Sequence, residues 1–342
     1  MSHDTLCFIW FFLLGALLTG YAILDGFDLG VGILHPFVPR SDRDRRVLIN
    51  SIGPLWDGNE VWLVTFGGAM FAMFPEAYAT LFSGFYSAFM ALLFCLILRA
   101  VSMEFRGKFG VGAWRRLWDG AFFLGSAGVP MLFGVAAGTI MLGVPLDPRG
   151  NYAGSLMDQI TPYSLLVGVM TVSLFTMHGS IFLYLKTEGP LQERVHRYVW
   201  RTFGLFLVLY ILTTIFTLIQ VPAAVENFRV LPWLWIVPVL NGLAVANIPR
   251  AIYQGRPAYA FISSCATIAA FVFLFSAALF PNMVRAADGP SRSLTIYLAS
   301  SSSTTLKIGL LFVLIGMPCV IAYTAIVYWT FRGKVRIGEH SY

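Results

Sequence analysis

The chain is poor in charged residues. Only 12% of its 342 residues are Asp, Glu, Lys or Arg, whereas 58% are hydrophobic. A soluble domain carries about 25% charged residues, because its surface must face water. About half that share leaves too little polar surface for a water-soluble globule of this length, and the high apolar content excludes a disordered chain. The sequence therefore predicts an all-α polytopic membrane protein.

Motifs for metal binding and for common enzyme chemistry are also missing. The four cysteines lie inside apolar runs and form no CxxC or other metal-ligand spacing; they are Cys7, Cys95, Cys265 and Cys319. The sequence has no P-loop, no HExxH, no GxSxG with partners and no TVGYG filter. We therefore predict no metal site and no catalytic residue in this chain, and we interpret the cysteines as small buried hydrophobes.

Long apolar runs are abundant. A bilayer core needs about 20 mainly apolar residues per helix, and we identify nine such runs: roughly 7–34, 58–75, 77–100, 117–142, 162–185, 201–221, 231–248, 258–280 and 305–331. No connection between them is long enough for a soluble domain. Residues 1–342 are therefore predicted to form a single integral membrane domain.

The basic residues predict the orientation. Most of the 23 Lys and Arg residues fall in alternate connections and in the tail, at 35–57, 99–116, 186–201, 249–257 and 332–336. The positive-inside rule places these segments in the cytoplasm. With nine spans, the N-terminus then lies outside and the C-terminus is cytoplasmic. The pI near 9.2 is thus cytoplasmic-face charge, and no nucleic-acid partner is expected.

The first apolar run contains two carboxylates. Asp25 and Asp28 are three residues apart and lie on one face of the predicted helix. A charge at mid-bilayer costs roughly 2.5–3.5 kcal/mol, so each one needs a reason. One interpretation is a proton path. The other is that both carboxylates lie near the cytoplasmic end and pair with the basic residues at 40–46.

The second run begins with an unusually polar string that holds Asp57 and Glu60. The D-x-x-E spacing before an apolar run predicts a capping box, with Asp57 as N-cap and Glu60 at N3. A carboxylate at this interface is also placed for proton uptake. Trp62, a turn deeper, suits either interfacial anchoring or the lining of a passage for a small gas.

Three further polar residues have alternative interpretations. Glu104 lies just beyond the third run, where an ion pair with Arg106 is the simplest expectation. Asp119 is predicted to cap the fourth run. His178 is the histidine well inside a span, so by position it is the one conceivable haem ligand. A hydrogen bond between helices is the favoured interpretation of His178.

Several long segments resemble a known family. They are DGFDLGVGIL at 25–34, RRVLINSIGPLWDGNEVWLVTFGGAMFAMFPEAYA at 45–79, FSGFY at 82–86, WRRLWDGAFFLGS at 114–126, HGSIFLYLKTEG at 178–189 and YTAIVYWTFRGKV at 323–335. Together they resemble subunit II of the cytochrome bd quinol oxidases. The resemblance extends from the first run to the tail, although 205–300 matches mainly in hydropathy.

The resemblance implies a function in a bacterial cytoplasmic (inner) membrane. The family complex is a respiratory terminal oxidase that oxidises quinol, reduces dioxygen to water and draws protons from the cytoplasm. Subunit I is implied to carry two b-type haems, one d-type haem and the quinol site. Subunit II is implied to carry no haem and to fold as two four-helix bundles, here roughly 7–142 and 162–280, plus a peripheral ninth helix at 305–331. The implied partners are subunit I, quinol and lipid, and a small accessory transmembrane subunit is left open.

The resemblance also implies roles for individual residues. Asp25, Asp28, Asp57 and Glu104 occupy the positions of carboxylates proposed to feed protons toward the haems of subunit I. Some relatives carry Gln in place of Glu60, which favours its capping role. Trp62 matches a residue that lines a proposed dioxygen passage.

Two other functions compete with this interpretation. A purely structural subunit that stabilises a haem-bearing partner would need the same fold, because each carboxylate also has a structural interpretation. A secondary transporter would explain the glycines beside Asp25 and Asp28. The transporter is disfavoured because the acidic residues cluster at the predicted cytoplasmic ends.

Overall fold

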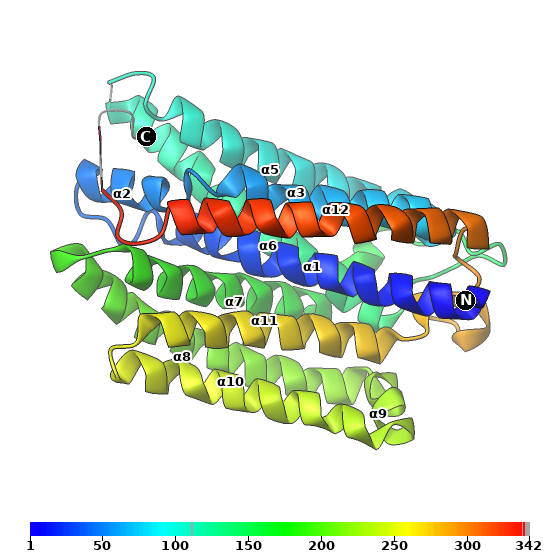
Figure 1. Ribbon diagram of the computed structural model, residues 1–342. Helices are drawn as coiled ribbons and strands as arrows, with labels where there is room; N and C mark the ends of the chain where they lie inside the picture. The colour runs from blue at the N-terminus through cyan, green and yellow to red at the C-terminus, as the bar shows by residue number, and fades with distance from the viewer. Residues whose placement is uncertain (111, 337, 339–342) are drawn as a thin grey trace.

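The computed structural model describes residues 1–110, 112–336 and 338, and this part of the chain is predominantly helical (Figure 1). The elements are α1 (His3–Leu34), α2 (Asp42–Ile52), α3 (Trp56–Met73), α4 (Pro75–Gly84), α5 (Tyr86–Phe105), α6 (Gly112–Leu142), η1 (Leu156–Gln159), α7 (Pro162–Lys186), α8 (Gly189–Gln220), η2 (Pro222–Val225), α9 (Glu226–Val230), η3 (Pro232–Trp235), α10 (Ile236–Tyr253), α11 (Pro257–Leu279), β1 (Asn282–Val284), η4 (Pro290–Arg292), β2 (Leu294–Thr295) and α12 (Ser303–Thr330). The prediction of an all-helical membrane fold is confirmed. The two short strands form an antiparallel pair.

Eight helical segments of the described chain are long and apolar enough to cross a membrane: 3–34, 86–105, 112–142, 162–186, 189–220, 232–253, 257–279 and 303–330. The remaining predicted span, 58–75, corresponds to α3, whose 18 residues lie alongside α1 and α12 (Figure 1). Because α3 has only 18 residues, Asp57 and Glu60 in its first turns fall within any span-length segment of it. The predicted span at 77–100 is not continuous, since α4 ends at Gly84 and α5 begins at Tyr86.

Helix α1 is the centre of the fold. It packs against α3 and α6 from the first half of the chain and against α7 and α11 from the second. Its closest approach is to α7, where a Cβ placed on Gly30 would overlap the carbonyl oxygen of Phe175 and the backbone of Gly179. Small residues at such crossings let membrane helices pack backbone against backbone. The two halves are thus joined through α1.

Helix α12 lies on the outside of the array. Leu306 and Gly309 are its buried residues, and it contacts α1 and α3 (Figure 1). At one end, the indole of Trp10 donates to the carbonyl of Leu306 over 2.9 Å. At the other end, the Lys334 ammonium donates to the carbonyl of Thr187 over 2.7 Å. Polar contacts at its two ends therefore fix this peripheral helix, and its apolar middle stays uncovered.

The N-terminus and the end of α12 lie at opposite ends of the helix array (Figure 1). We call the end that holds α2, the end of α5 and the start of α6 the basic end. It carries most of the arginines discussed below, and the positive-inside rule predicts that it faces the cytoplasm.

Candidate functional site

A buried ion pair joins α1, α5 and α3 in the half of the helix array nearer the basic end. Asp25 on α1 and Arg99 on α5 are both 0% exposed, and the Nη1 atom of Arg99 lies 2.6 Å from Oδ1 of Asp25. The second guanidinium nitrogen lies 3.3 Å from Glu60 on α3. The interpretation in which Asp25 pairs with the basic residues at 40–46 is therefore wrong. Arg99 also does not belong to a cytoplasmic loop, because α5 continues to Phe105 and buries it.

The predicted capping box at the start of α3 is also wrong. The N-cap residue is Leu55, so Asp57 is already the second residue of the helix and makes no side-chain cap bond. The helix begins earlier than the pattern suggests, and the carboxylate of Glu60 binds Arg99. Asp57 is exposed, while Glu60 is partly buried.

A second chain of hydrogen bonds starts at Asp28. The amide nitrogen of Asn59 donates to Oδ2 of Asp28 over 2.7 Å and to the carbonyl of Leu24 over 3.1 Å. The amide oxygen of Asn59 accepts from the hydroxyl of Tyr328 over 3.0 Å. Asp28 and Asn59 are buried. This chain of hydrogen bonds links α1, α3 and α12. Oδ2 of Asp28 therefore binds Asn59 and none of the arginines at 40–46.

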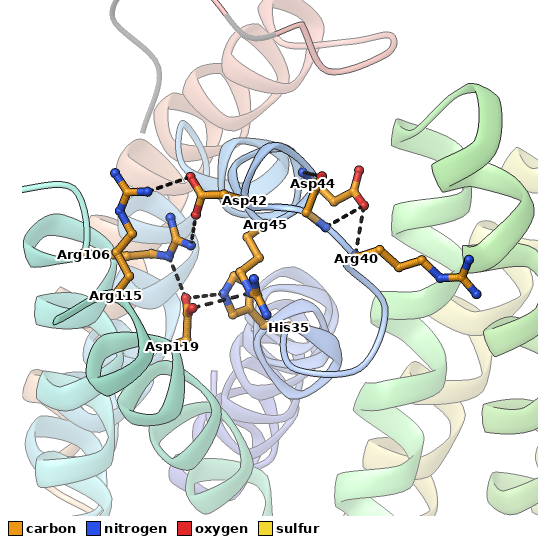
Figure 2. Close-up of polar contacts among 9 residues, drawn as sticks. His35, Arg40, Asp42, Asp44, Arg45, Arg106, Arg115 and Asp119 are labelled. Atoms are coloured by element: carbon orange, nitrogen blue, oxygen red, sulfur yellow. Dashed lines mark hydrogen bonds and ion pairs between the residues drawn. The ribbon is translucent and has the colours of Figure 1, made fainter. Parts of the chain in front are cut away.

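A charged cluster covers the basic end of α1, and Asp119 is its centre (Figure 2). Oδ1 of Asp119 accepts from Nε2 of His35 over 2.7 Å and from Nε of Arg106 over 2.6 Å, and Oδ2 lies 3.4 Å from Nε of Arg45. Arg106 also binds Asp42 over 2.6 Å. The predicted capping role of Asp119 is wrong, because α6 begins at Gly112 and places Asp119 in its third turn.

The environment of this cluster controls two ionisations outside the spans. Burial lowers the pKa of His35, and this effect outweighs the opposing effect of the carboxylate of Asp119. Partial burial opposes the ionisation of Asp42, but the hydrogen bond and charge of Arg106 outweigh it and lower the pKa of Asp42. At neutral pH we therefore expect a neutral imidazole beside charged carboxylates and guanidinium groups.

The structure places the other two predicted site residues away from these contacts. Glu104 is exposed in the last turn of α5, and Arg106 binds Asp42 and Asp119. Trp62 is half-buried, and its ring lies against α1 at Gly20, where a Cβ would overlap it. The proton role of Glu104 and the dioxygen role of Trp62 stay predictions.

Both ring nitrogens of His178 are occupied. Nε2 donates to the carbonyl of Ile23 on α1 over 3.0 Å, so in the neutral ring Nδ1 accepts from the hydroxyl of Ser264 on α11 over 2.7 Å. The ring also stacks on Phe261. The interpretation of His178 as a hydrogen-bonded link between helices is confirmed.

An apolar cavity of about 1070 Å³ lies among the helices. Its walls come from both halves of the chain, and from α3 it is lined by Leu63, Val64, Phe66, Gly67, Gly68 and Met70. Trp62 directly precedes this lining segment. The cavity has the dimensions and chemistry to hold a small apolar molecule.

Comparison with known proteins agrees with the fold and with the motifs. The family described as cytochrome bd terminal oxidase subunit II matches residues 6–331. The chain belongs to this family. It is 33% identical to cytochrome bd-I ubiquinol oxidase subunit 2 of Escherichia coli K12 over 98% of this chain and 96% of that one. It is 35% identical to cytochrome bd ubiquinol oxidase subunit 2 of Bacillus subtilis 168 over 97% of this chain and 96% of that one.

A solved structure supports the fold. The chain superimposes on one from the bd oxidase of Geobacillus thermodenitrificans with a TM-score of 0.79 and 19% identity, covering 96% of this chain and 98% of that chain. As a subunit II family member, the chain is a multi-pass bacterial membrane protein and part of a terminal oxidase of respiratory electron transport. Its family implies a subunit I partner and haem cofactors in the complex.

The described residues contain no group of three or more His, Cys, Asp or Glu that could hold a metal ion. His178 uses both nitrogens in bonds between helices, and Nε2 of His35 is bonded to Asp119. His340 lies outside the described residues.

Four residues of the site were missed in the sequence: Arg99, Asn59, Tyr328 and His35. Arg99 carried a usable signal, because an arginine directly after the apolar string FCLIL is costly in a membrane unless it is paired. Its partner could not be identified from spacing, since Asp25 is 74 residues away. Asn59 and Tyr328 meet only because α12 returns to the side of α3.

Proposed function

We propose that this chain is the haem-free subunit II of a respiratory quinol:dioxygen oxidoreductase in the bacterial cytoplasmic membrane. It supports subunit I, which holds two b-type haems, one d-type haem and the quinol site, and it contributes proton and dioxygen access routes to those haems. The complex transfers electrons from quinol to dioxygen, and four protons and four electrons convert each dioxygen to two waters. The family and the names of its ubiquinol-oxidising relatives support this reaction. Membership of this family leaves the transporter alternative without support.

The buried carboxylates of α1 carry the proton part of the proposal. Each has one oxygen held by a protein partner, Arg99 for Asp25 and Asn59 for Asp28. The second oxygen of each, Oδ2 of Asp25 and Oδ1 of Asp28, is buried without a hydrogen-bond partner among the described residues. A buried polar atom of this kind is ordinarily satisfied by internal water. Carboxylates bonded to water can take up and release protons, so the pair is suited to a proton route.

Exposed carboxylates at the basic end would supply this route. Asp57 is exposed at the start of α3, one turn before Glu60, which contacts the buried ion pair. Glu104 is exposed at the end of α5, the helix that carries Arg99. Both lie on the side predicted to face the cytoplasm.

The apolar cavity supports the dioxygen part of the proposal. Dioxygen is small and apolar, and it partitions into apolar space in preference to water. The cavity of about 1070 Å³ offers such space beside α3, next to Trp62. This proposal treats Trp62 as a wall of the passage at the edge of the cavity.

The test uses the Asp57→Asn variant of the intact two-subunit complex. We expect at least tenfold slower dioxygen reduction, because a positioned proton-transfer group contributes about 10²–10⁴-fold to a rate. The haem absorption spectrum should be unchanged. Asp4→Asn, an exposed carboxylate at the opposite end of α1, is the matched control and should keep full activity. Full activity in Asp57→Asn with normal haem content would remove Asp57 from the proton route.

A further inference from the structure

A row of polar residues follows one face of α1 toward the basic end. Asp25, Asp28, Gly32 and His35 are separated by three, four and three residues, the spacing that places side chains on one face of a helix. His35 is the first residue after α1, at its C-cap. This face contacts α6 through Asp119 and Ser126 and contacts α5 through Arg99.

Every polar side chain of the row has a buried atom without a hydrogen-bond partner among the described residues. These atoms are Oδ2 of Asp25, Oδ1 of Asp28 and Nδ1 of His35. Oγ of Ser126 on α6 is also buried without a hydrogen-bond partner among the described residues. All four residues are 0% exposed. Leaving a buried polar atom without a hydrogen bond is energetically costly, so four such atoms in one row indicate a hydrated row.

Contacts between the helices give the order of the row. His35 bonds Asp119 at the basic end. One turn of α1 before His35, the side chain of Ser126 packs against Gly32, and a Cβ placed on Gly32 would overlap the hydroxyl of Ser126. The adjacent Gly125 abuts the backbone of Arg99, which holds Asp25. Ser126 thus lies between the cluster at the basic end and the buried ion pair.

We infer that His35 is the proton-loading residue of this row, which leads from the basic end past Ser126 to Asp28 and Asp25. The inference rests on the proposed proton function and adds His35 as an entrance besides the exposed Asp57 and Glu104. Nε2 of His35 donates to Asp119 and is fixed, so Nδ1 is the atom that exchanges a proton with water in the row. Loading breaks an O–H bond of a protonated water at the basic end and forms an N–H bond at Nδ1. Release breaks that N–H bond and forms an O–H bond on a water of the row next to Ser126, so the ring returns to its neutral state.

The groups around His35 favour a short residence of the proton. Asp119 from α6 stabilises the imidazolium, whereas the guanidinium groups of Arg106, at the end of α5, and Arg45, on α2, oppose it (Figure 2). Burial acts in the same direction as the two arginines and lowers the pKa of His35. A proton on His35 is therefore held weakly and passes on, as a relay group requires.

The experiment compares His35→Gln with the wild type in the purified, haem-loaded complex. A glutamine amide can still donate to Asp119 but cannot carry a proton, so it separates proton transfer from the structural tie. We expect dioxygen reduction to fall at least fivefold, with a larger solvent deuterium isotope effect and an unchanged haem spectrum. The matched control is His196→Gln on α8, where the histidine accepts from Trp200 away from the row. It should behave as wild type.

A second variant, His35→Ala, tests the inference if the complex with His35→Gln fails to assemble. His35→Ala creates space beside Asp119, and added imidazole should restore turnover in a concentration-dependent way. Wild-type turnover and isotope effect in His35→Gln, or haem-loaded His35→Ala that imidazole does not rescue, would overturn the inference. If Asp57→Asn slows turnover while His35→Gln does not, the entrance is wrong and the proposed proton function stands. If both variants keep full turnover, the proton function fails as well.

Discussion

The guanidinium of Arg99 binds the carboxylate of Asp25 over 2.6 Å, and neither side chain is exposed. The pair links α5 to α1 across 74 residues of sequence. A charge inside a membrane protein is tolerated when a partner of opposite charge compensates it. The same contact therefore both stabilises the fold and leaves one carboxylate oxygen of Asp25 available to water.

We predict that Arg99→Met strongly destabilises the complex. Removing one partner of a buried ion pair costs about 3–5 kcal/mol, because the remaining charge is uncompensated. Purification should give less assembled complex, and thermal unfolding of that complex should show a lower Tm. The double variant Arg99→Met/Asp25→Leu should recover most of the lost stability, since no fully buried charge of the pair remains and Glu60, the other partner of Arg99, is only partly buried. Equal destabilisation of the single and double variants would contradict this account.

Gly30→Ala should prevent normal packing of α1 against α7. The new methyl group would overlap the carbonyl oxygen of Phe175 and the backbone of Gly179, which cannot move aside as a side chain can. Overpacking costs typically 1–3 kcal/mol, and backbone clashes lie at the upper end. The yield of assembled complex and its Tm are the measurements. Gly204→Ala on α8, where no atom lies within 4 Å of the new Cβ, is the control.

The stability of the complex should decrease on acidification through the ionisation of His35. An unfolded histidine titrates near 6.5, and burial lowers the pKa of His35 in the folded protein. Below about pH 6.5 the unfolded chain therefore binds more protons than the folded one, so stability falls as the pH falls. Asp42, whose pKa is also lowered, acts in the same direction but only near its unfolded value of about 3.9.

The measurement for this prediction is the Tm of the complex between pH 7.5 and 5.0. The wild type should lose stability over this range, and His35→Gln should flatten the part of the curve below pH 6.5. An identical pH dependence in the two proteins would show that His35 does not titrate there.

Narrowing the apolar cavity should weaken the apparent affinity for dioxygen. Gly67 lines the cavity, and no atom lies within 4 Å of a Cβ placed on it, so Gly67→Leu adds volume there without a clash at that atom. We expect a severalfold higher KM for dioxygen at an unchanged maximal rate. Dioxygen consumption at low concentration measures this, with Gly204→Leu as the control. An unchanged KM would remove the cavity from the dioxygen route.

The sequence determined the class of protein and most of its elements. Apolar runs of about 20 residues can form only helices in a bilayer, because every backbone polar group must be bonded within the helix. The resulting all-helical fold agrees with this. The segments at 25–34 and 45–79 indicated the family, and the resemblance implied the peripheral position of α12. The cost of placing a charge inside the bilayer identified Asp25 and Asp28 as residues that need an explanation.

The tertiary structure decided the partners. Local patterns assigned Asp57, Glu60 and Asp119 to helix caps, but α3 and α6 begin earlier than the patterns indicate. Glu60 and Asp119 instead form ion pairs with Arg99 and Arg106, respectively. Spacing along a helix reports which residues share a face. It does not report which distant helix covers that face, and in a low-dielectric interior the covering helix supplies the counter-charge. Only the packing of α1 against α6, together with the ion pair from α5, brought Asp119 and Arg99 to the row that contains Asp25 and His35.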